Sequence, residues 1–384
     1  MEVEIGESRN LTTRNRATDT GGKHHNFLAT LRKAAVLPFV KPVMKLSAAI
    51  RPLHPRSVFR ISRGSRAEVL NVFARIECGG VTGQGEASPN AFYNETAEKV
   101  LDTLAKGAPH LVGCRIRSPR DIERLWESLW PIVAPSRAAQ CAIDLALWDW
   151  LAQSEQTTIC HLAHGHPLRP IPTFVTLGLS TPEELAQKLQ PICDWPLIKI
   201  KSDANADLTP IRQVREHSLA KIAVDANCAW SGHDLAVLAQ ELAGLGAVFI
   251  EQPLPPGAEL PAGLSGGNPI PIVADESCVV LEDVEKIARL TNRESTPRVG
   301  RFSGFNIKLV KCGGLTPALK MAQRGRDLGL ITMTGCMLES SLLIAAGAVV
   351  AQKTDYADLD GSWLLKDDPF QLIHIENGIL KPLS

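Results

Sequence analysis

Four short apolar runs between residues 197 and 275 each end in a charged side chain, and they decide the fold: LIKIK (197–201), KIAVD (221–225), VFIE (248–251) and PIVAD (271–275). Their acidic ends, Asp225, Glu251 and Asp275, lie 26 and 24 residues apart, about the length of one strand–helix unit. The carboxyl ends of parallel barrel strands meet at one mouth. The spacing therefore predicts that three carboxylates distant in the sequence come together there.

The chain around these runs repeats the order strand, turn, helix. Eight segments read as strands: 173–179, 197–203, 221–227, 248–254, 272–277, 305–311, 331–337 and 356–361. Helical patterns such as PEELAQKLQPI and LEDVEKIARL separate them, which is typical of a parallel α/β barrel. An open doubly wound sheet is the structural alternative. No GxGxxG motif follows the first strand, which weakens a dinucleotide-binding interpretation.

The N-terminal part of the chain has a different pattern. Three alternating segments with glycine-containing turns, 45–53, 68–78 and 81–87, predict an antiparallel meander, and helical patterns follow over 93–130 and 135–153. We therefore expect four regions: an N-terminal extension without regular structure (1–43), an α+β capping domain (44–168), the barrel (169–361), and a C-terminal segment that packs back on the capping domain (362–384).

Composition narrows the class of protein. The 384 residues contain 41 Lys and Arg and 41 Asp and Glu, so the net charge of zero gives no argument for a nucleic-acid or anionic-membrane partner. No apolar stretch reaches the roughly 20 residues that a membrane span needs. The nine cysteines are scattered singly without a CxxC pair, which predicts reduced thiols and a cytoplasmic protein.

The three acids predict a magnesium site. Mg²⁺ prefers carboxylate oxygens and keeps open positions for water and substrate oxygens. A single acid at a strand end is more often a helix cap or an ion-pair partner, but three at one spacing favour the metal. Polar residues just beyond the acids are candidates for supporting contacts: Asn227, Gln252, Glu276 and Ser277.

Lysines flank the acids on both sides. Lys199 and Lys201 alternate with isoleucines, so their side chains point the same way, and Lys308 ends another strand-like run, FNIK. Lys311 is expected to point to the other face or into a loop. One lysine can remove the proton α to a metal-bound carboxylate, and the other can return a proton to the opposite face.

These segments together resemble the enolase superfamily, in its muconate-lactonizing-enzyme branch. The match covers about residues 44–384 and rests on LIKIK, VDANCAW, FIEQPL, ADES, FNIKLVKCGG and GCMLES, in that order. The resemblance implies an α/β fold with a TIM-like (β/α)7β barrel and an α+β capping domain. It also implies one Mg²⁺ per subunit on the three acids, Lys201 and Lys308 as the acid/base pair, and Lys199 polarising the substrate carboxylate.

The segment YADLDG indicates the reaction within this branch. Asp358 and Asp360 project to the same face and can hold a cationic group. In dipeptide epimerases a similar DxD receives the substrate ammonium group. We therefore expect epimerisation of a dipeptide at the α-carbon of its C-terminal residue, through an enediolate. An N-acylamino acid racemase, an o-succinylbenzoate synthase or cycloisomerase, and a catalytically silent binding protein remain as alternatives.

The preferred side chains stay open. Arg63 is a candidate contact for an acidic side chain or the terminal carboxylate, whereas Phe92 and Tyr93 favour apolar residues. Met337 is a candidate lining residue, and Glu339 a candidate supporting residue. The resemblance also implies a homo-oligomer, without fixing the number of subunits.

Overall fold

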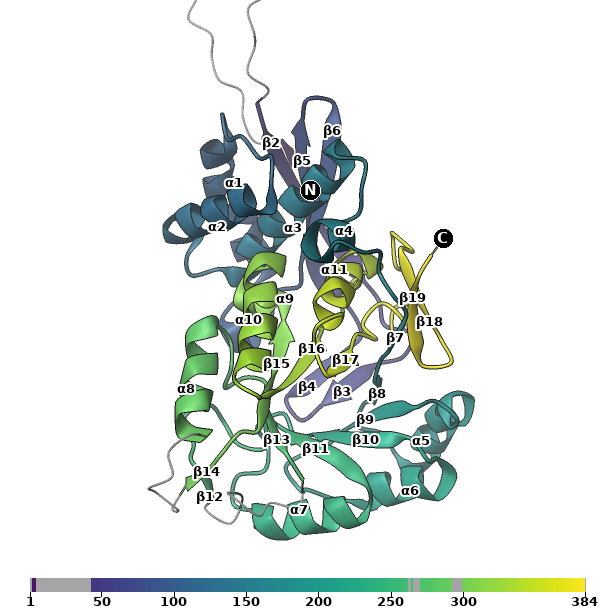
Figure 1. The fold of residues 1–384 in the computed structure, drawn as a ribbon. Coiled ribbons are helices and arrows are strands. Elements are labelled where there is room, and N and C mark those ends of the chain that lie inside the picture. Colours follow the sequence, from purple (N-terminus) through teal and green to yellow (C-terminus); the bar gives the residue numbers. More distant parts are fainter. Residues whose placement is uncertain (1, 5–42, 262–263, 265–269, 292–298, 384) are drawn as a thin grey trace, which may run out of the picture.

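The computed structural model describes residues 2–4, 43–261, 264, 270–291 and 299–383. Its N-terminal part contains an antiparallel sheet of four strands in the order β1-β2-β5-β6 (Figure 1). These are β1 (Glu2–Glu4), β2 (Lys45–Leu53), β5 (Val69–Cys78) and β6 (Val81–Ala87). The meander predicted from the sequence is therefore present. Strand β1 lies in the segment for which no regular structure was expected, and most of the rest of residues 1–43 lies outside the described residues.

The capping domain also contains the helices α1 (Ala97–Gly107), α2 (Pro119–Val133), α3 (Arg137–Ser154) and the short α4 (Ile159–His164), with 3-10 turns η1 (Ala91–Tyr93) and η2 (Ala108–Leu111). Helices α1 and α3 pack against the sheet. Helix α3 packs directly on β6, because glycines there leave room for its backbone. A Cβ atom at Gly83 would lie 2.1 Å from the Ala146 carbonyl oxygen, and one at Gly85 2.0 Å from that of Ala142. Thr96 and Ser136 begin α1 and α3 by accepting backbone hydrogen bonds from Lys99 and Ala139.

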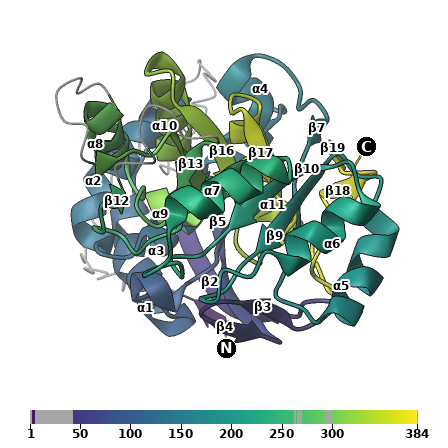
Figure 2. The ribbon, with the colours of Figure 1, turned by 90° about the horizontal axis from the view of Figure 1, so that it is seen from below.

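The second part is a parallel barrel of eight strands in the order β17-β16-β15-β13-β11-β10-β9-β8. Figure 1 labels these strands, and Figure 2 shows the molecule from below. In chain order they are β8 (Val175–Leu177), β9 (Leu197–Lys201), β10 (Lys221–Asp225), β11 (Ala247–Glu251), β13 (Ile272–Ala274), β15 (Gly304–Lys308), β16 (Ile331–Gly335) and β17 (Tyr356–Asp358). The backbone N–H of Phe174 donates to the Ala357 carbonyl at 2.8 Å, which joins the two ends of the sheet. The predicted barrel is confirmed.

Helices on the outside connect the strands: α5 (Pro182–Leu189) with η3 (Gln190–Ile192), α6 (Thr209–His217), α7 (Leu235–Gly244), α8 (Leu281–Thr291), α10 (Leu315–Asp327) and α11 (Ser341–Ala351). A four-residue helix, α9 (Leu309–Cys312), follows β15 directly. The described residues between β11 and β13 contain β12 (Leu260–Pro261), which pairs with β14 (Val299–Gly300).

The two parts are joined by buried polar contacts. Asp144 of α3 accepts hydrogen bonds from the backbone N–H and the hydroxyl of Thr316, at 2.9 and 2.6 Å, and so caps the start of α10. Glu86 of β6 accepts the backbone N–H of Ser340 at 3.0 Å, at the start of α11. Because each acid comes from one part and each helix start from the other, these contacts hold the capping domain over the barrel.

Two short hairpins complete the fold. The C-terminal strands β18 (Ile373–Glu376) and β19 (Ile379–Pro382) pair with each other and with β7 (Ile171–Pro172), just before the first barrel strand. The chain before β18 also contacts the capping domain, since Leu365 forms a bridge with Pro55 and Phe370 packs on Phe73. Strands β3 (Phe59–Ile61) and β4 (Gly64–Arg66) form a hairpin that reaches from the capping domain to the barrel (Figure 1).

Candidate active site

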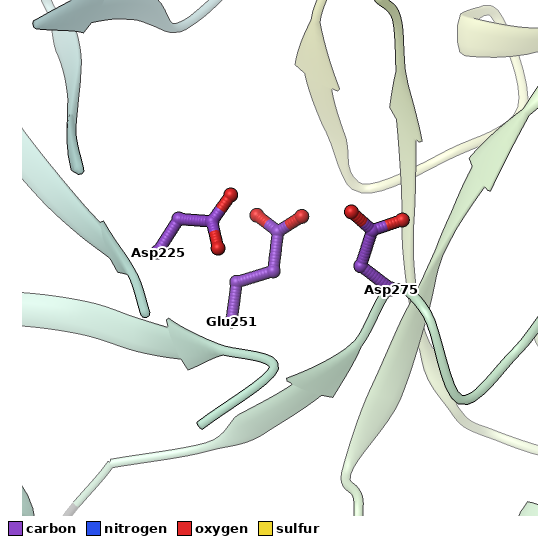
Figure 3. Close-up of side chains that lie close together, drawn as sticks. All are labelled: Asp225, Glu251 and Asp275. Atoms are coloured by element: carbon purple, nitrogen blue, oxygen red, sulfur yellow. The ribbon is translucent and has the colours of Figure 1, made fainter. Parts of the chain in front are cut away.

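Three buried carboxylates meet at the carboxyl ends of neighbouring barrel strands. Asp225 ends β10, Glu251 ends β11, and Asp275 follows β13 by one residue. Their side chains point toward one another (Figure 3), and one oxygen from each lies within 4.8 Å of the others. No more than 2% of any of the three residues is exposed. The sequence spacing thus brings the three predicted metal ligands together in space.

The protonation behaviour of these acids reflects their crowding. Burial and the neighbouring Asp225 raise the pKa of Glu251 to about 7. Burial also opposes ionisation of Asp225 and Asp275, but lysines outweigh it: Lys201 and Lys199 hold the pKa of Asp225 at about 2, and Lys308 and Lys311 hold that of Asp275 well below its ordinary value. An all-oxygen donor set with closely packed negative charge fits a hard divalent cation such as Mg²⁺.

Neighbouring polar groups hold the carboxylates in place. Asn227 donates its backbone N–H and its side-chain amide to the two oxygens of Asp225, at 2.8 and 3.2 Å. The side-chain oxygen of Gln252 accepts the backbone N–H groups of Asp275 and Ser277 at 2.9 and 3.0 Å. The amide of Asn306 donates to Glu251 at 2.8 Å, a contact that the sequence interpretation missed. Asn306 precedes Lys308 by two positions on β15, so strand periodicity places both side chains on one face.

Lysines surround the triad. Lys199 is buried, and its Nζ lies 2.6 Å from Asp358, 2.7 Å from Glu251 and 3.3 Å from Asp225. Lys201 lies 2.6 Å from the Oδ2 atom of Asp225.

Lys308 lies 2.8 Å from the Oδ2 atom of Asp275. Its strand, β15, is four positions from β9, the strand of Lys201, in an order of eight. The two lysines therefore stand on opposite sides of the barrel mouth.

The prediction for Lys311 is wrong. Strand β15 ends at Lys308 and the chain turns at once into α9, so the side chain of Lys311 points back under the strand ends instead of away from them. Its Nζ lies 2.6 Å from the Oδ1 atom of Asp275 and is buried. Asp275 thus carries one lysine on each carboxylate oxygen.

The DLD segment lies beside the triad, at the end of β17. Asp358 contacts Lys199, and Asp360 accepts the backbone N–H of Thr176 at 2.6 Å, across the closure of the barrel. Burial, followed by the charge of Asp358, raises the pKa of Asp360 to about 7. The other oxygen of Asp360 lies 4.0 Å from the Cys336 thiol. Two buried acids, of which Asp358 contacts Lys199, leave acceptor capacity for a further cation.

The β3–β4 hairpin places Arg63 over the barrel mouth. Its guanidinium lies 2.7 Å from Glu276, donates to the carbonyl of Asn227 at 2.9 Å, and stacks 4.6 Å from the centre of the Phe92 ring. Glu276 is buried, and within the described part of the chain its Oε2 atom has no hydrogen-bond partner. Tyr93 lies beside Asp275 and Glu276, and burial followed by those charges raises the pKa of its phenol. Arg63 therefore meets an acid of the protein.

Met337 and Glu339 lie in the loop after β16. The Met337 sulfur lies 3.6 Å from the side-chain amide of Asn90, which belongs to the loop of the capping domain that contains Phe92. Glu339 accepts the backbone N–H of Met337 at 3.0 Å and is buried. Burial and the nearby Glu86 raise the pKa of Glu339 to about 8. Met337 thus contacts the capping domain, and Glu339 fixes the loop that carries it.

A TIM-like barrel under a capping domain, with three acids on successive strand ends between two lysines, defines an enolase-type fold and site. Residues 184–382 match the enolase C-terminal domain-like family, and residues 45–163 match the mandelate racemase / muconate lactonizing enzyme N-terminal domain. The chain belongs to this family.

Similar proteins give the same class. An L-Ala-D/L-amino acid epimerase of Flavobacterium johnsoniae is 32% identical over 338 residues, which cover 88% of this chain and 96% of that protein. The L-Ala-D/L-Glu epimerase of Escherichia coli is 34% identical over 325 residues, covering 82% and 92%. A crystal structure of a dipeptide epimerase from Methylococcus capsulatus, complexed with Mg and L-Arg-D-Lys, is 29% identical with a TM-score of 0.77, covering 90% and 98%.

Proposed function

We propose that the protein is a Mg²⁺-dependent dipeptide epimerase that inverts the α-carbon of the C-terminal residue of its substrate. The observation that carries the proposal is the placement of Lys201 and Lys308 on opposite sides of three clustered carboxylates, with the DLD acids beside them. The similarity to epimerases over most of both chains supports it.

Lys201 and Lys308 are proposed as the acid/base pair. In one direction Lys201 takes the α-proton and Lys308 donates a proton to the opposite face, and in the other direction they exchange roles. Burial opposes the charge of Lys308, but the Asp275 carboxylate outweighs it and raises the pKa of the lysine, so it rests as the proton donor. Removal of the α-proton leaves the substrate as an enediolate.

The three acids are proposed to hold one Mg²⁺ per subunit. When bound, the ion supplies positive charge that stabilises the negative charge developing on the substrate carboxylate. Lys199 lies between the acids and the DLD segment, so its ammonium group can also face that carboxylate. Asn227, Gln252 and Asn306 keep the three acids oriented.

Asp358 and Asp360 are proposed to receive the ammonium group of the N-terminal residue. Asp358 already pairs with Lys199, whereas Asp360 contacts the neutral groups of Thr176 and, at 4.0 Å, the Cys336 thiol. Asp360 is therefore the stronger acceptor for the substrate. An anionic N-succinyl group would meet repulsion at these acids, which favours a dipeptide over an N-acylated amino acid.

The capping domain is proposed to close the site above the side chain of the C-terminal residue. Arg63 and Met337 are the proposed contacts, from the hairpin and from the loop after β16. Since Glu276 lies 2.7 Å from Arg63, the charge of the guanidinium is largely balanced within the protein. This balance, with Phe92 stacked on Arg63, favours uncharged side chains over acidic ones.

A cytoplasmic location and a homo-oligomeric state are also proposed. All nine cysteines lie in the described part of the chain and are free thiols, which suits a reducing compartment. None of the described helices combines the length and apolar character that crossing a bilayer requires. Light scattering of the purified protein measures the number of subunits directly.

The test is incubation with a dipeptide library in D₂O and Mg²⁺, followed by mass spectrometry. Epimerisation exchanges the α-proton of the C-terminal residue and adds one mass unit, while chiral chromatography detects the second epimer. Turnover of an N-succinyl amino acid without exchange in any dipeptide would instead support the racemase alternative.

A further inference from the structure

Lys311 has an unusually complete set of contacts for a buried lysine. Its Nζ lies 2.7 Å from the backbone carbonyl oxygen of Asp275, 2.9 Å from that of Asn306 and 3.1 Å from that of Cys278, and it lies 2.6 Å from the Oδ1 atom of Asp275. An ammonium group has three N–H donors, so these acceptors use all of them. Because three of the acceptors belong to the backbone, the position of Nζ is fixed by the fold.

The two oxygens of Asp275 consequently have different surroundings. Oδ1 is held by Lys311, whose nitrogen cannot move without losing three carbonyl partners. Oδ2 contacts Lys308, which is proposed to move protons during the reaction. Lys308 can therefore move away from Oδ2, whereas Lys311 stays on Oδ1. Of the two oxygens of Asp275, only Oδ2 can be freed to bind a cation at modest cost in free energy.

We propose that Lys311 is a positioning residue that restricts Asp275 to binding a metal ion through one oxygen, and so favours Mg²⁺ over Ca²⁺. The inference rests on the proposed metal site and deepens it. Mg²⁺ demands a near-ideal octahedron with short bonds of about 2.0–2.1 Å, which single carboxylate oxygens provide. Ca²⁺ accepts longer bonds and both oxygens of one carboxylate, a geometry that Lys311 blocks at Asp275.

The ratio of two metal affinities separates positioning from charge. Replacing Lys311 by methionine removes a positive charge near the site, which favours any divalent cation equally because both ions carry the same charge. That effect cancels when the Ca²⁺ affinity is divided by the Mg²⁺ affinity. A change in the ratio therefore reports whether Asp275 can bind the ion through its second oxygen as well.

The experiment is calorimetric titration of the full-length protein with Mg²⁺ and with Ca²⁺. In Lys311→Met the ratio of Ca²⁺ to Mg²⁺ affinity is expected to rise by about tenfold, the scale of outer contacts on metal ligands. Lys308→Met removes the same charge from the other oxygen of Asp275 and is expected to leave the ratio unchanged. An unchanged ratio in Lys311→Met, or an equal rise in both variants, overturns the inference.

Two further measurements keep the inference testable. Asp275→Asn is expected to weaken both ions strongly; if it does not, the metal site itself is misassigned, and the premise for Lys311 falls with it. If Lys311→Met does not fold, crystals of the native protein soaked in Ca²⁺ give the answer. Asp275 should then bind Ca²⁺ through one oxygen with Lys311 still on Oδ1, and binding through both oxygens contradicts the proposal.

Discussion

Replacing Asp360 with asparagine should separate recognition of the substrate ammonium from the rest of the reaction. The amide oxygen of asparagine can still accept the backbone N–H of Thr176, so the closure between β8 and β17 is kept. The substitution removes one negative charge from a residue that is 3% exposed. The substitution should therefore weaken the binding only of ligands that place a positive group near Asp360.

The expected loss follows from the burial of this acid. Removing one partner of a buried, hydrogen-bonded charge pair costs about 2–5 kcal/mol. Partial compensation by Asp358, which keeps its contact with Lys199, places the loss near the lower half of that range. A loss of about 3 kcal/mol corresponds to a decrease of roughly 150-fold in kcat/KM, at about 1.4 kcal/mol for each factor of ten.

The assay compares two substrates that differ only in the amino group. The best dipeptide from the library and its deamino counterpart, an N-propionyl amino acid for an alanyl dipeptide, are followed by α-proton exchange in D₂O. Asp360→Asn should slow the dipeptide by roughly 150-fold and leave exchange in the propionyl compound unchanged, since that compound has no charge to lose.

A matched control and a second variant sharpen the result. Asp355 lies at the opposite end of β17, where it accepts the backbone N–H and hydroxyl of Thr332, so Asp355→Asn makes the same chemical change away from the barrel mouth. It should affect neither substrate. Asp358→Asn should slow both, because Asp358 also holds Lys199. An equal loss for both substrates in Asp360→Asn would refute the role given to Asp360.

Three further predictions follow from the same contacts. Because the pKa of Asp360 is raised to about 7, this acid becomes neutral below that pH. The affinity for L-alanyl-aminoisobutyrate, a dipeptide without an α-proton in its C-terminal residue, should therefore fall about tenfold per pH unit below 7 in calorimetric titrations. Asp360→Asn should remove this pH dependence, and an affinity of the native protein that does not change with pH would contradict the prediction. In denaturant titrations, Asp144→Ala should lower the free energy of unfolding by about 2–4 kcal/mol, because it leaves the start of α10 without its cap. Asp102 is exposed, so Asp102→Ala should change the free energy of unfolding by less than about 0.5 kcal/mol. Chelation of the metal should abolish activity, and added Mg²⁺ should restore it. In thermal melts, Mg²⁺ at about 100 times its Kd should stabilise the native protein by about 2.7 kcal/mol and should not stabilise Glu251→Gln. Equal stabilisation of the two proteins would contradict the metal site.

Periodicity in the sequence accounts for most of the fold and for the metal triad. Each barrel strand is a short apolar run, and the residue that ends it faces the mouth because side chains alternate along a strand. Asp225 and Glu251 end their strands in this way, and Lys199 and Lys201 share one face as expected. The alternation of side chains along a strand depends only on neighbouring residues, so it can be predicted from a single sequence.

Contacts that depend on where the chain turns could not be predicted in this way. Lys311 was expected to face away, but α9 begins directly after Lys308 and reverses its direction. The pairing of Arg63 with Glu276 joins residues more than 200 positions apart on a hairpin and a barrel loop, and no local pattern specifies it. Helix α11 is apolar on all sides, so it lacks the one-sided pattern that reveals a surface helix.

The central claim is that two lysines act from opposite faces of one α-carbon. Its most direct test follows both epimers of the best dipeptide by ¹H NMR in D₂O, with Lys201→Met and Lys308→Met beside the native enzyme. The native enzyme should exchange and interconvert both epimers. Each variant should fail to epimerise but still exchange the α-proton of one epimer through its remaining lysine, and the two variants should choose opposite epimers. Epimerisation at the native rate by either variant, or exchange of the same epimer by both, would contradict the account.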